Sequence, residues 1–151
     1  MAEFDILVSG GILADGSVSD IGITGDTIAA LGDLSGSTAS KVIDARGDLV
    51  SPPFVDPHFH MDATLSYGTP RINASGTLLE GIALWGELRE TSTVDEMVAR
   101  ALTYCDWAVS MGLLAIRSHV DTTPDHLRGV TAMIEVRERV KTYLDLQLVA
   151  F

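Results

Sequence analysis

The sequence has little of what several classes of protein require. Its single cysteine, Cys105, excludes a disulfide within the chain and fits a reducing compartment. No apolar run approaches the ~20 residues that cross a bilayer, and the first residues lack the regions of a signal peptide. Lysine and arginine number 10 against 21 acids, which argues against nucleic acid because its phosphates are bound through basic side chains. We therefore expect a cytoplasmic protein that binds neither nucleic acid nor membranes.

What is present is the composition of a folded protein. Of the 151 residues, 46% are hydrophobic and 21% are charged, which excludes a disordered chain. The length is enough for one ordinary domain with a real core. Cys105 falls within a helical pattern, so we expect it to pack in the interior and to take no part in catalysis.

Residues 1–50 read as short strands separated by Gly and Asp. Segments such as Phe4–Ser9 and Val18–Thr24 alternate, and Asp15-Gly16 is a pair favoured in hairpins. Gly10-Gly11 signals a turn or a bulge. We predict a small antiparallel sheet that serves as a scaffold and carries no chemistry.

Residues 51–151 alternate between strand and helix patterns. Helical spacing of apolar residues predicts three helices, at residues 76–90, 93–111 and 125–143, and apolar runs predict strands around Phe54–His60, Leu113–Ile116 and Leu144–Phe151. The second helix opens with the capping box Thr93-Val94-Asp95-Glu96. The order predicts an α/β fold with a parallel sheet. The pattern alone does not choose between a barrel and a doubly wound sheet.

Two histidines, His58 and His60, end the first of these strands. Side chains alternate faces along a strand, so both imidazoles point the same way and Phe59 points to the other side. Imidazoles about 7 Å apart along one strand face can hold a metal ion between them. In the alternative interpretation one histidine packs in the core and the other caps a turn.

Four segments around and beyond this pair carry a family likeness: Val50–Asp62, Gly76–Ile82, Arg117–Asp121 and Leu144–Phe151. Taken in order they resemble the amidohydrolase superfamily, most closely its cytosine-deaminase-like branch. The resemblance implies that residues 1–50 are the N-terminal part of a β-sandwich domain. It also implies that residues 51–151 are the first three strands and connecting helices of a (β/α)8 barrel. Such a barrel takes roughly 200 to 250 residues, so we expect it to be incomplete in this chain.

The resemblance further implies a metal-dependent hydrolytic deaminase. His58 and His60 would bind one divalent ion, Zn or Fe, which activates water to attack the amino-bearing carbon of an N-heterocycle. Leu78 would line the substrate pocket. The other ligands and the proton-shuttling residues are expected beyond Phe151, so we assign no catalytic residue to this chain and expect it to be inactive alone.

Three further polar residues lie close to these segments: Asp62, His119 and Asp121. Because His119 and Asp121 share one face at the end of a strand, they could supply a third metal ligand, or they could hydrogen-bond a metal-binding imidazole and orient it. The other interpretation is a satisfied polar pair at the rim of the barrel. Asp62 could orient an imidazole in the same way or cap its loop.

Two functions therefore remain open. In the first, the chain is the N-terminal part of a deaminase of cytosine, isoguanine, another pyrimidine or an N-alkylated triazine. Its partners would be this small substrate, the remaining C-terminal part of the enzyme and, in a homo-oligomer, further copies. In the second, the chain is a non-catalytic α/β scaffold or association module. Metal content discriminates between them.

Overall fold

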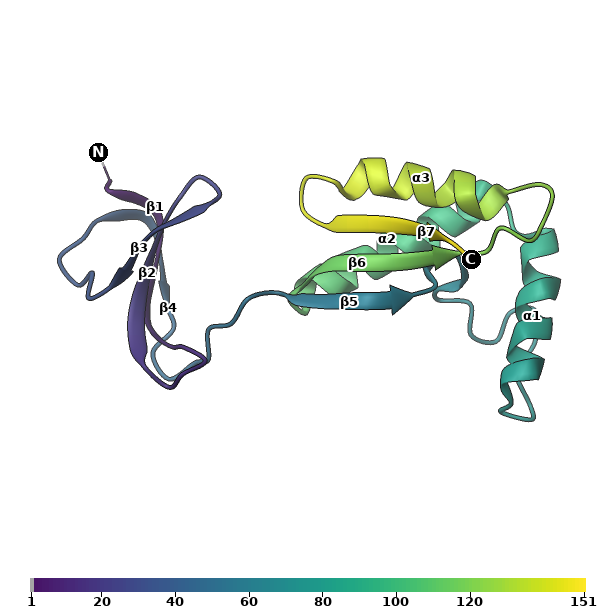
Figure 1. The fold of residues 1–151 in the computed structure, drawn as a ribbon, viewed down its shortest axis with the longest axis horizontal. Helices are drawn as coiled ribbons and strands as arrows, with labels where there is room; N and C mark the ends of the chain where they lie inside the picture. The colour runs from purple at the N-terminus through teal and green to yellow at the C-terminus, as the bar shows by residue number, and fades with distance from the viewer. Residues whose placement is uncertain (1) are drawn as a thin grey trace. The chain divides into compact units, whose positions relative to one another are not determined.

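The computed structural model describes residues 2–151, which divide after Pro52 into two compact units. The first is built of strands and the second of strands and helices, so the chain as a whole is a mixed α/β protein (Figure 1). Within the described residues, every helix is too short or too polar to cross a bilayer.

The first unit is a four-stranded sheet in the order β3-β2-β1-β4. Its strands are β1 (Phe4–Ile12), β2 (Val18–Thr24), β3 (Thr27–Gly32) and β4 (Ala39–Asp44). The predicted antiparallel pairing is confirmed for β1 with β2 and for β2 with β3. It is wrong for β4, which pairs parallel with β1. The reason is the connection: residues 33–38 carry the chain from one edge of the sheet to the other.

One carboxylate holds this crossing segment in place. Asp20 on β2 accepts hydrogen bonds from the backbone amides of Gly10 (2.7 Å) and Leu34 (2.9 Å). The pairing of β1 with β2 slips between Val8 and Gly11, and Gly10 has φ +69°. The bulge that the glycine pair predicted is therefore present, and it exposes an amide that Asp20 satisfies.

The second unit contains a three-stranded parallel sheet in the order β5-β6-β7. Its strands are β5 (Phe54–Phe59), β6 (Leu113–Val120) and β7 (Asp145–Ala150). Helices α2 (Val94–Ser110) and α3 (Arg128–Val140) pack against the sheet and against each other (Figure 1). Strands that alternate with helices in a parallel sheet are what the sequence pattern predicted for this region.

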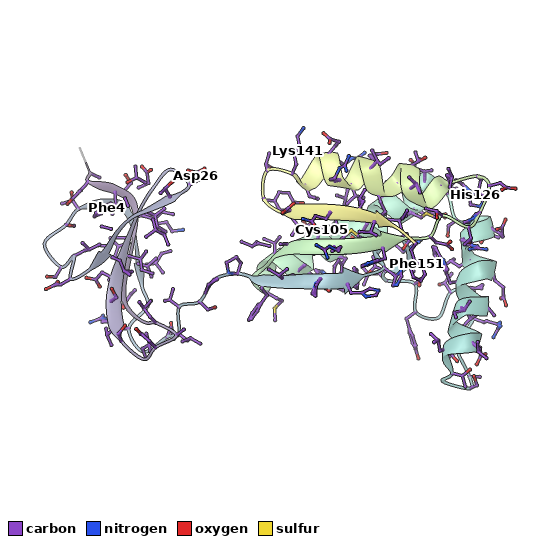
Figure 2. The ribbon with its side chains drawn as sticks, in the orientation of Figure 1. Phe4, Asp26, Cys105, His126, Lys141 and Phe151 are labelled. Carbon is purple, nitrogen blue, oxygen red and sulfur yellow. The ribbon has the colours of Figure 1, made fainter. Side chains whose placement is uncertain are left out.

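The core of this unit lies between the sheet and the two helices. Ile116 and Leu146 reach it from the strands, and Cys105 lies there fully buried, as its place in a helical pattern predicted (Figure 2). The helices contribute apolar side chains at helical spacing. Those fully or almost fully buried are Met97, Val98, Ala101, Ala132, Met133, Val136 and Val140.

The predicted helices exist, but the third is shorter at both ends, since α3 ends at Val140 and the prediction extended it to residue 143. Helix α2 begins with the predicted capping box, in which Thr93 and Glu96 satisfy each other's backbone amides. Helix α3 was predicted to begin at Asp125 and begins instead at Arg128. Leu127 before it has φ +45°, a left-handed conformation that breaks the helix. Residues 124–127 therefore form a turn.

Alternation along the strands leaves the other face of the sheet open. Arg117 and Gln147 are exposed there and hydrogen-bond to each other (Nε to Oε1, 3.1 Å). At the carboxyl ends of the strands, β5 runs into a short 3-10 helix (η1, Met61–Ala63), and α1 (Leu78–Thr91) stands beyond it (Figure 1). The polar ends of β5 and β6 are therefore next to α1.

Candidate active site

Three imidazoles converge at the carboxyl ends of β5 and β6. The ring centroids of His58 and His60 are 5.5 Å apart, and that of His119 lies 4.0 Å from His58 and 6.0 Å from His60. Phe59, which lies between His58 and His60 in the sequence, packs on the core side and stacks on Tyr104, with 4.4 Å between the ring centroids. The alternation expected of a strand is therefore present, and it brings His58 and His60 together.

His119 adds a buried ring nitrogen. Its Nδ1 has no hydrogen-bond partner in the described part of the chain. Burial, followed by the proximity of His58 and His60, lowers the pKa of the His119 imidazole and favours its neutral form. Neutral imidazole is the form that binds metals. Yet among residues 2–151 no three His, Cys, Asp or Glu side chains are arranged to hold a metal ion, so His119 does not complete a site with the other two.

The segment after His60 is fixed by buried hydrogen bonds. The amide of Met61 donates to the hydroxyl of Ser118 on β6 (3.1 Å), and both residues have no exposed surface. From α2, the Arg100 guanidinium donates to the carbonyl oxygens of Thr64 (3.1 Å) and Asp62 (3.4 Å). Neighbouring strand and helix thus hold the backbone that follows the histidine pair.

Asp62 joins the ends of the two strands. Its carboxylate is buried and accepts the backbone amides of Asp121 (3.0 Å) and Ala63 (3.1 Å). Burial raises the pKa of Asp62, and the amide of Asp121 opposes this only in part. Among the described residues, neither Asp62 nor Asp121 hydrogen-bonds to an imidazole. Their predicted role in orienting a metal ligand stays a prediction.

Asp121 binds helix α1. Its carboxylate accepts the indole N–H of Trp85 (2.9 Å) and the amide and hydroxyl of Thr123 (2.9 and 2.7 Å), and it forms an ion pair with Arg89. Burial alone would raise the pKa of Asp121. The hydrogen bonds from Thr123, Trp85 and Arg89 outweigh burial and lower it to about 2, so the group is a carboxylate at neutral pH.

A cavity of about 650 Å³ opens between α1 and these strand ends. It is lined by four of the residues that the sequence singled out: His60, Asp62, Leu78 and Asp121. Its lining does not include His58 or His119. Trp85 of α1 is half-buried and lies between the core and the cavity. The other residues that line the cavity are Ala63, Gly81, Ile82, Gly86, Arg89, Thr123 and Phe151.

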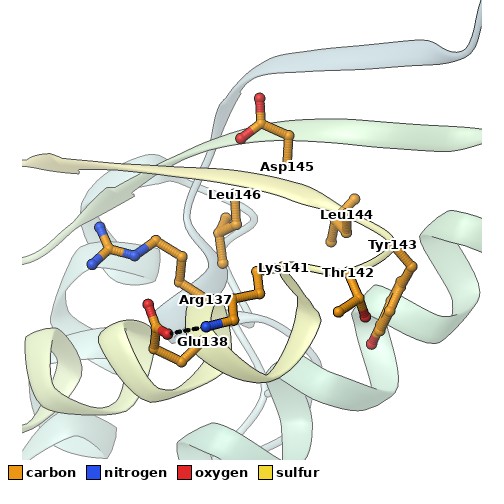
Figure 3. Close-up of a pocket in the computed structure, with 8 residues that line it drawn as sticks. All are labelled: Arg137, Glu138, Lys141, Thr142, Tyr143, Leu144, Asp145 and Leu146. Carbon is orange, nitrogen blue, oxygen red and sulfur yellow. Dashed lines mark hydrogen bonds and ion pairs between the residues drawn. The ribbon is translucent and has the colours of Figure 1, made fainter. Parts of the chain in front are cut away.

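A second hollow, of about 530 Å³, lies at the opposite end of the sheet, where β7 begins (Figure 3). It is lined by residues 137–138 and 141–146, and its charges include the ion pair of Lys141 with Glu138 (2.8 Å). It has no histidine in its lining. Of the residues that the sequence singled out, His60, Asp62, Leu78 and Asp121 line the cavity beside α1, and none of them lines this hollow.

Three residues of the site were missed in the sequence analysis: Arg89, Arg100 and Ser118. Arg89 had a usable signal, since it follows Trp85 by four residues and shares the helix face of Leu78 and Ile82. Arg100 and Ser118 had none. Each acts on backbone groups that lie far away in the sequence, and only the fold brings them there.

Sequence comparison finds relatives along almost the whole chain. Residues 41–147 match the model of the amidohydrolase family. N-isopropylammelide isopropyl amidohydrolase from Pseudomonas sp. (strain ADP) is 31% identical over 99% of this chain. The chain spans 38% of the length of that relative.

Structure comparison agrees with this. 5-methylcytosine deaminase from Klebsiella pneumoniae, crystallised with 5-fluorocytosine, has a TM-score of 0.87 and 32% identity over 96% of this chain and 36% of its own. N-isopropylammelide isopropylaminohydrolase from Burkholderia multivorans has a TM-score of 0.74 and 27% identity, over 97% of this chain and 37% of its own.

Proposed function

The chain belongs to the amidohydrolase family, and on this premise we propose that it is the N-terminal part of a metal-dependent deaminase of an N-heterocycle. The reaction is hydrolysis: water attacks the amino-bearing carbon of the ring, the C–N bond breaks and ammonia leaves. The observation that carries the proposal is the pair His58 and His60, whose ring centroids are 5.5 Å apart, beside a cavity lined by His60 and Leu78.

We assign the two units to the parts of the fold expected from the family. Residues 1–50 would contribute to a β-sandwich, and residues 51–151 would be the first β/α units of a (β/α)8 barrel. The all-parallel order β5-β6-β7, with α2 and α3 packed against the sheet, supports the second assignment. In such barrels the chemistry lies at the carboxyl ends of the strands, which is where the histidines are.

His58 and His60 suit a divalent ion that takes imidazole nitrogen, Zn or Fe, and we propose one such ion. When bound, the ion supplies Lewis acidity that makes water nucleophilic at neutral pH. The two histidines are fewer ligands than a catalytic site needs. The remaining ligands and the proton-shuttling groups would come from the C-terminal part of the enzyme. Ser118 and Arg100 would hold the backbone after His60, so that the imidazole keeps its direction.

The cavity suits a flat, uncharged ring. Leu78, Ile82 and Trp85 form an apolar wall, and His60 also lines the cavity. Cytosine or another pyrimidine, isoguanine and N-alkylated triazines all have this shape. The relatives named for 5-methylcytosine and N-isopropylammelide support this range of substrates. Cytoplasmic location and a homo-oligomeric state remain part of the proposal.

Metal binding tests the proposal. Equilibrium dialysis of the chain against Zn²⁺ or Fe²⁺ should give about one ion per chain, bound weakly because the set of ligands is incomplete. His58→Ala should reduce the affinity by more than the ~10–100-fold that loss of an outer hydrogen-bonding group costs. The control is His126→Ala, which removes an imidazole in the turn before α3, outside the cluster of His58, His60 and His119 (Figure 2).

Two outcomes would contradict the proposal. A stable chain that binds no metal, or binds it equally well without His58, would favour the non-catalytic scaffold. Release of ammonia from cytosine by the chain alone would refute the assignment of the remaining catalytic groups to a further part of the enzyme.

A further inference from the structure

Helix α1 forms one wall of the cavity but buries little of its own surface. Leu88 is the one buried residue of the helix, whereas Leu78 and Leu79 near its start are 78% and 79% exposed. The first half of the helix is bound to the loop before it, because the Glu80 carboxylate accepts the Arg71 guanidinium (2.8 Å) and the amide of Ser75 (2.7 Å). These contacts do not attach the helix to the sheet.

Attachment to the sheet comes from the second half of α1, and much of it passes through one side chain. Asp121, at the end of β6, accepts both the Trp85 indole and the Arg89 guanidinium. Its own backbone amide donates to Asp62 (3.0 Å), two residues after His60. At the far end of the helix, Arg128 donates to the carbonyl oxygens of residues 90 and 92 (2.9 and 3.0 Å). Asp121 therefore links α1 to both strand ends, and Arg128 secures only the last turn.

We propose that Asp121 is a positioning residue, which holds helix α1 and its apolar wall against the strand ends that carry the histidines. Two of its partners, Trp85 and Arg89, are four residues apart on one helix face, so a single carboxylate restrains a full turn. Without it, α1 would keep the hydrogen bond from Arg89 to the Thr123 hydroxyl (2.7 Å) and the contacts of Arg128, and it would pivot about this end. If the proposed function holds, Asp121 sets the width of the substrate cavity without touching the reacting atoms.

The test uses the chain in a Trp107→Phe background, in which Trp85 is the one remaining tryptophan. Asp121→Ala removes both contacts. Asp121→Asn keeps an oxygen that accepts the indole N–H but loses the charge that pairs with Arg89. Asp125→Ala is the matched control: Asp125 is exposed in the neighbouring turn and has no hydrogen bond or ion pair within residues 2–151. The measurements are hydrogen exchange of α1, α2 and α3 and acrylamide quenching of Trp85.

With Asp121→Ala, we expect exchange of α1 amides to accelerate by roughly tenfold or more, because charge-assisted hydrogen bonds are lost. Quenching of Trp85 should rise, while α2 and α3 keep their protection. For Asp121→Asn, the α1 exchange rate and the quenching of Trp85 should lie between those of the parent chain and of Asp121→Ala. For Asp125→Ala, both should match the parent chain. Unchanged α1 exchange would overturn the proposal, and so would an equal loss of protection in all three helices. Neither readout depends on metal or substrate, so failure here is distinct from failure of the proposed deaminase function.

Discussion

The hydrogen bond between Met61 and Ser118 offers a sharp test of how the histidine segment is held. Ser118→Ala removes the hydroxyl that accepts the Met61 amide at 3.1 Å and changes little else in shape. Both residues have no exposed surface, so water cannot replace the lost acceptor without disturbing the packing. The amide would be left buried and unpaired.

The expected cost follows from that burial. An unsatisfied buried donor destabilises a protein by about 1–3 kcal/mol, and we take about 2 kcal/mol here. For a unit of this size the urea m-value is about 2 kcal/mol per M, so the midpoint of unfolding should fall by about 1 M. The m-value should not change, because the substitution leaves the buried area almost unaltered.

Tryptophan fluorescence is the appropriate assay for this change. Both tryptophans, Trp85 and Trp107, lie in the unit from Pro53 to Phe151, so the signal reports on that unit alone. The control is Ser110→Ala, which removes the hydroxyl of an exposed residue. Its free energy of unfolding should stay within about 0.5 kcal/mol of that of the parent chain. A midpoint for Ser118→Ala equal to that of the control would refute the reasoning.

Three further changes can be tested on the same chain. Gly86→Ala should raise the free energy of unfolding by about 1 kcal/mol, because alanine favours the helix and its Cβ would meet no atom within 4 Å; thermal unfolding measures this effect. The same substitution should narrow the cavity and weaken the binding of the bulkier heterocycles, which calorimetric titration measures. Hydrogen bonds from Ser75 and then Arg71 lower the pKa of Glu80 from 4.5 to about 2. The contribution of the Glu80 carboxylate to stability should therefore be complete above pH 4.5 and lost as the pH falls toward 2. Glu80→Gln should remove this pH dependence in unfolding curves recorded across this range. Burial raises the pKa of the Cys105 thiol to about 11, so a thiol reagent should react with this thiol only after urea unfolds the chain. Rapid reaction in the native state would contradict the place of Cys105 in the core.

Local patterns in the sequence predicted a large part of the second unit. The spacing of apolar residues predicted its helices, and Thr93 with Glu96 marked the start of one of them, because helix caps and helix faces depend on residues three or four apart. Strand alternation predicted that His58 and His60 share a face. The start of α3 could not be predicted in this way, since the left-handed conformation of Leu127 is not favoured by the residue itself.

The sequence by itself therefore determined the kinds of element, the buried helix faces and the histidine pair, all of which rest on neighbours within one or two turns or along one strand. The tertiary structure decided what lies beside them: the parallel pairing of β4 with β1, the approach of His119 to within 4.0 Å of His58, and the junction of Asp121 with Trp85 and Arg89. These contacts join residues that are more than 30 positions apart in the chain. Periodicity carries no information over such separations, because each contact depends on how whole strands and helices pack.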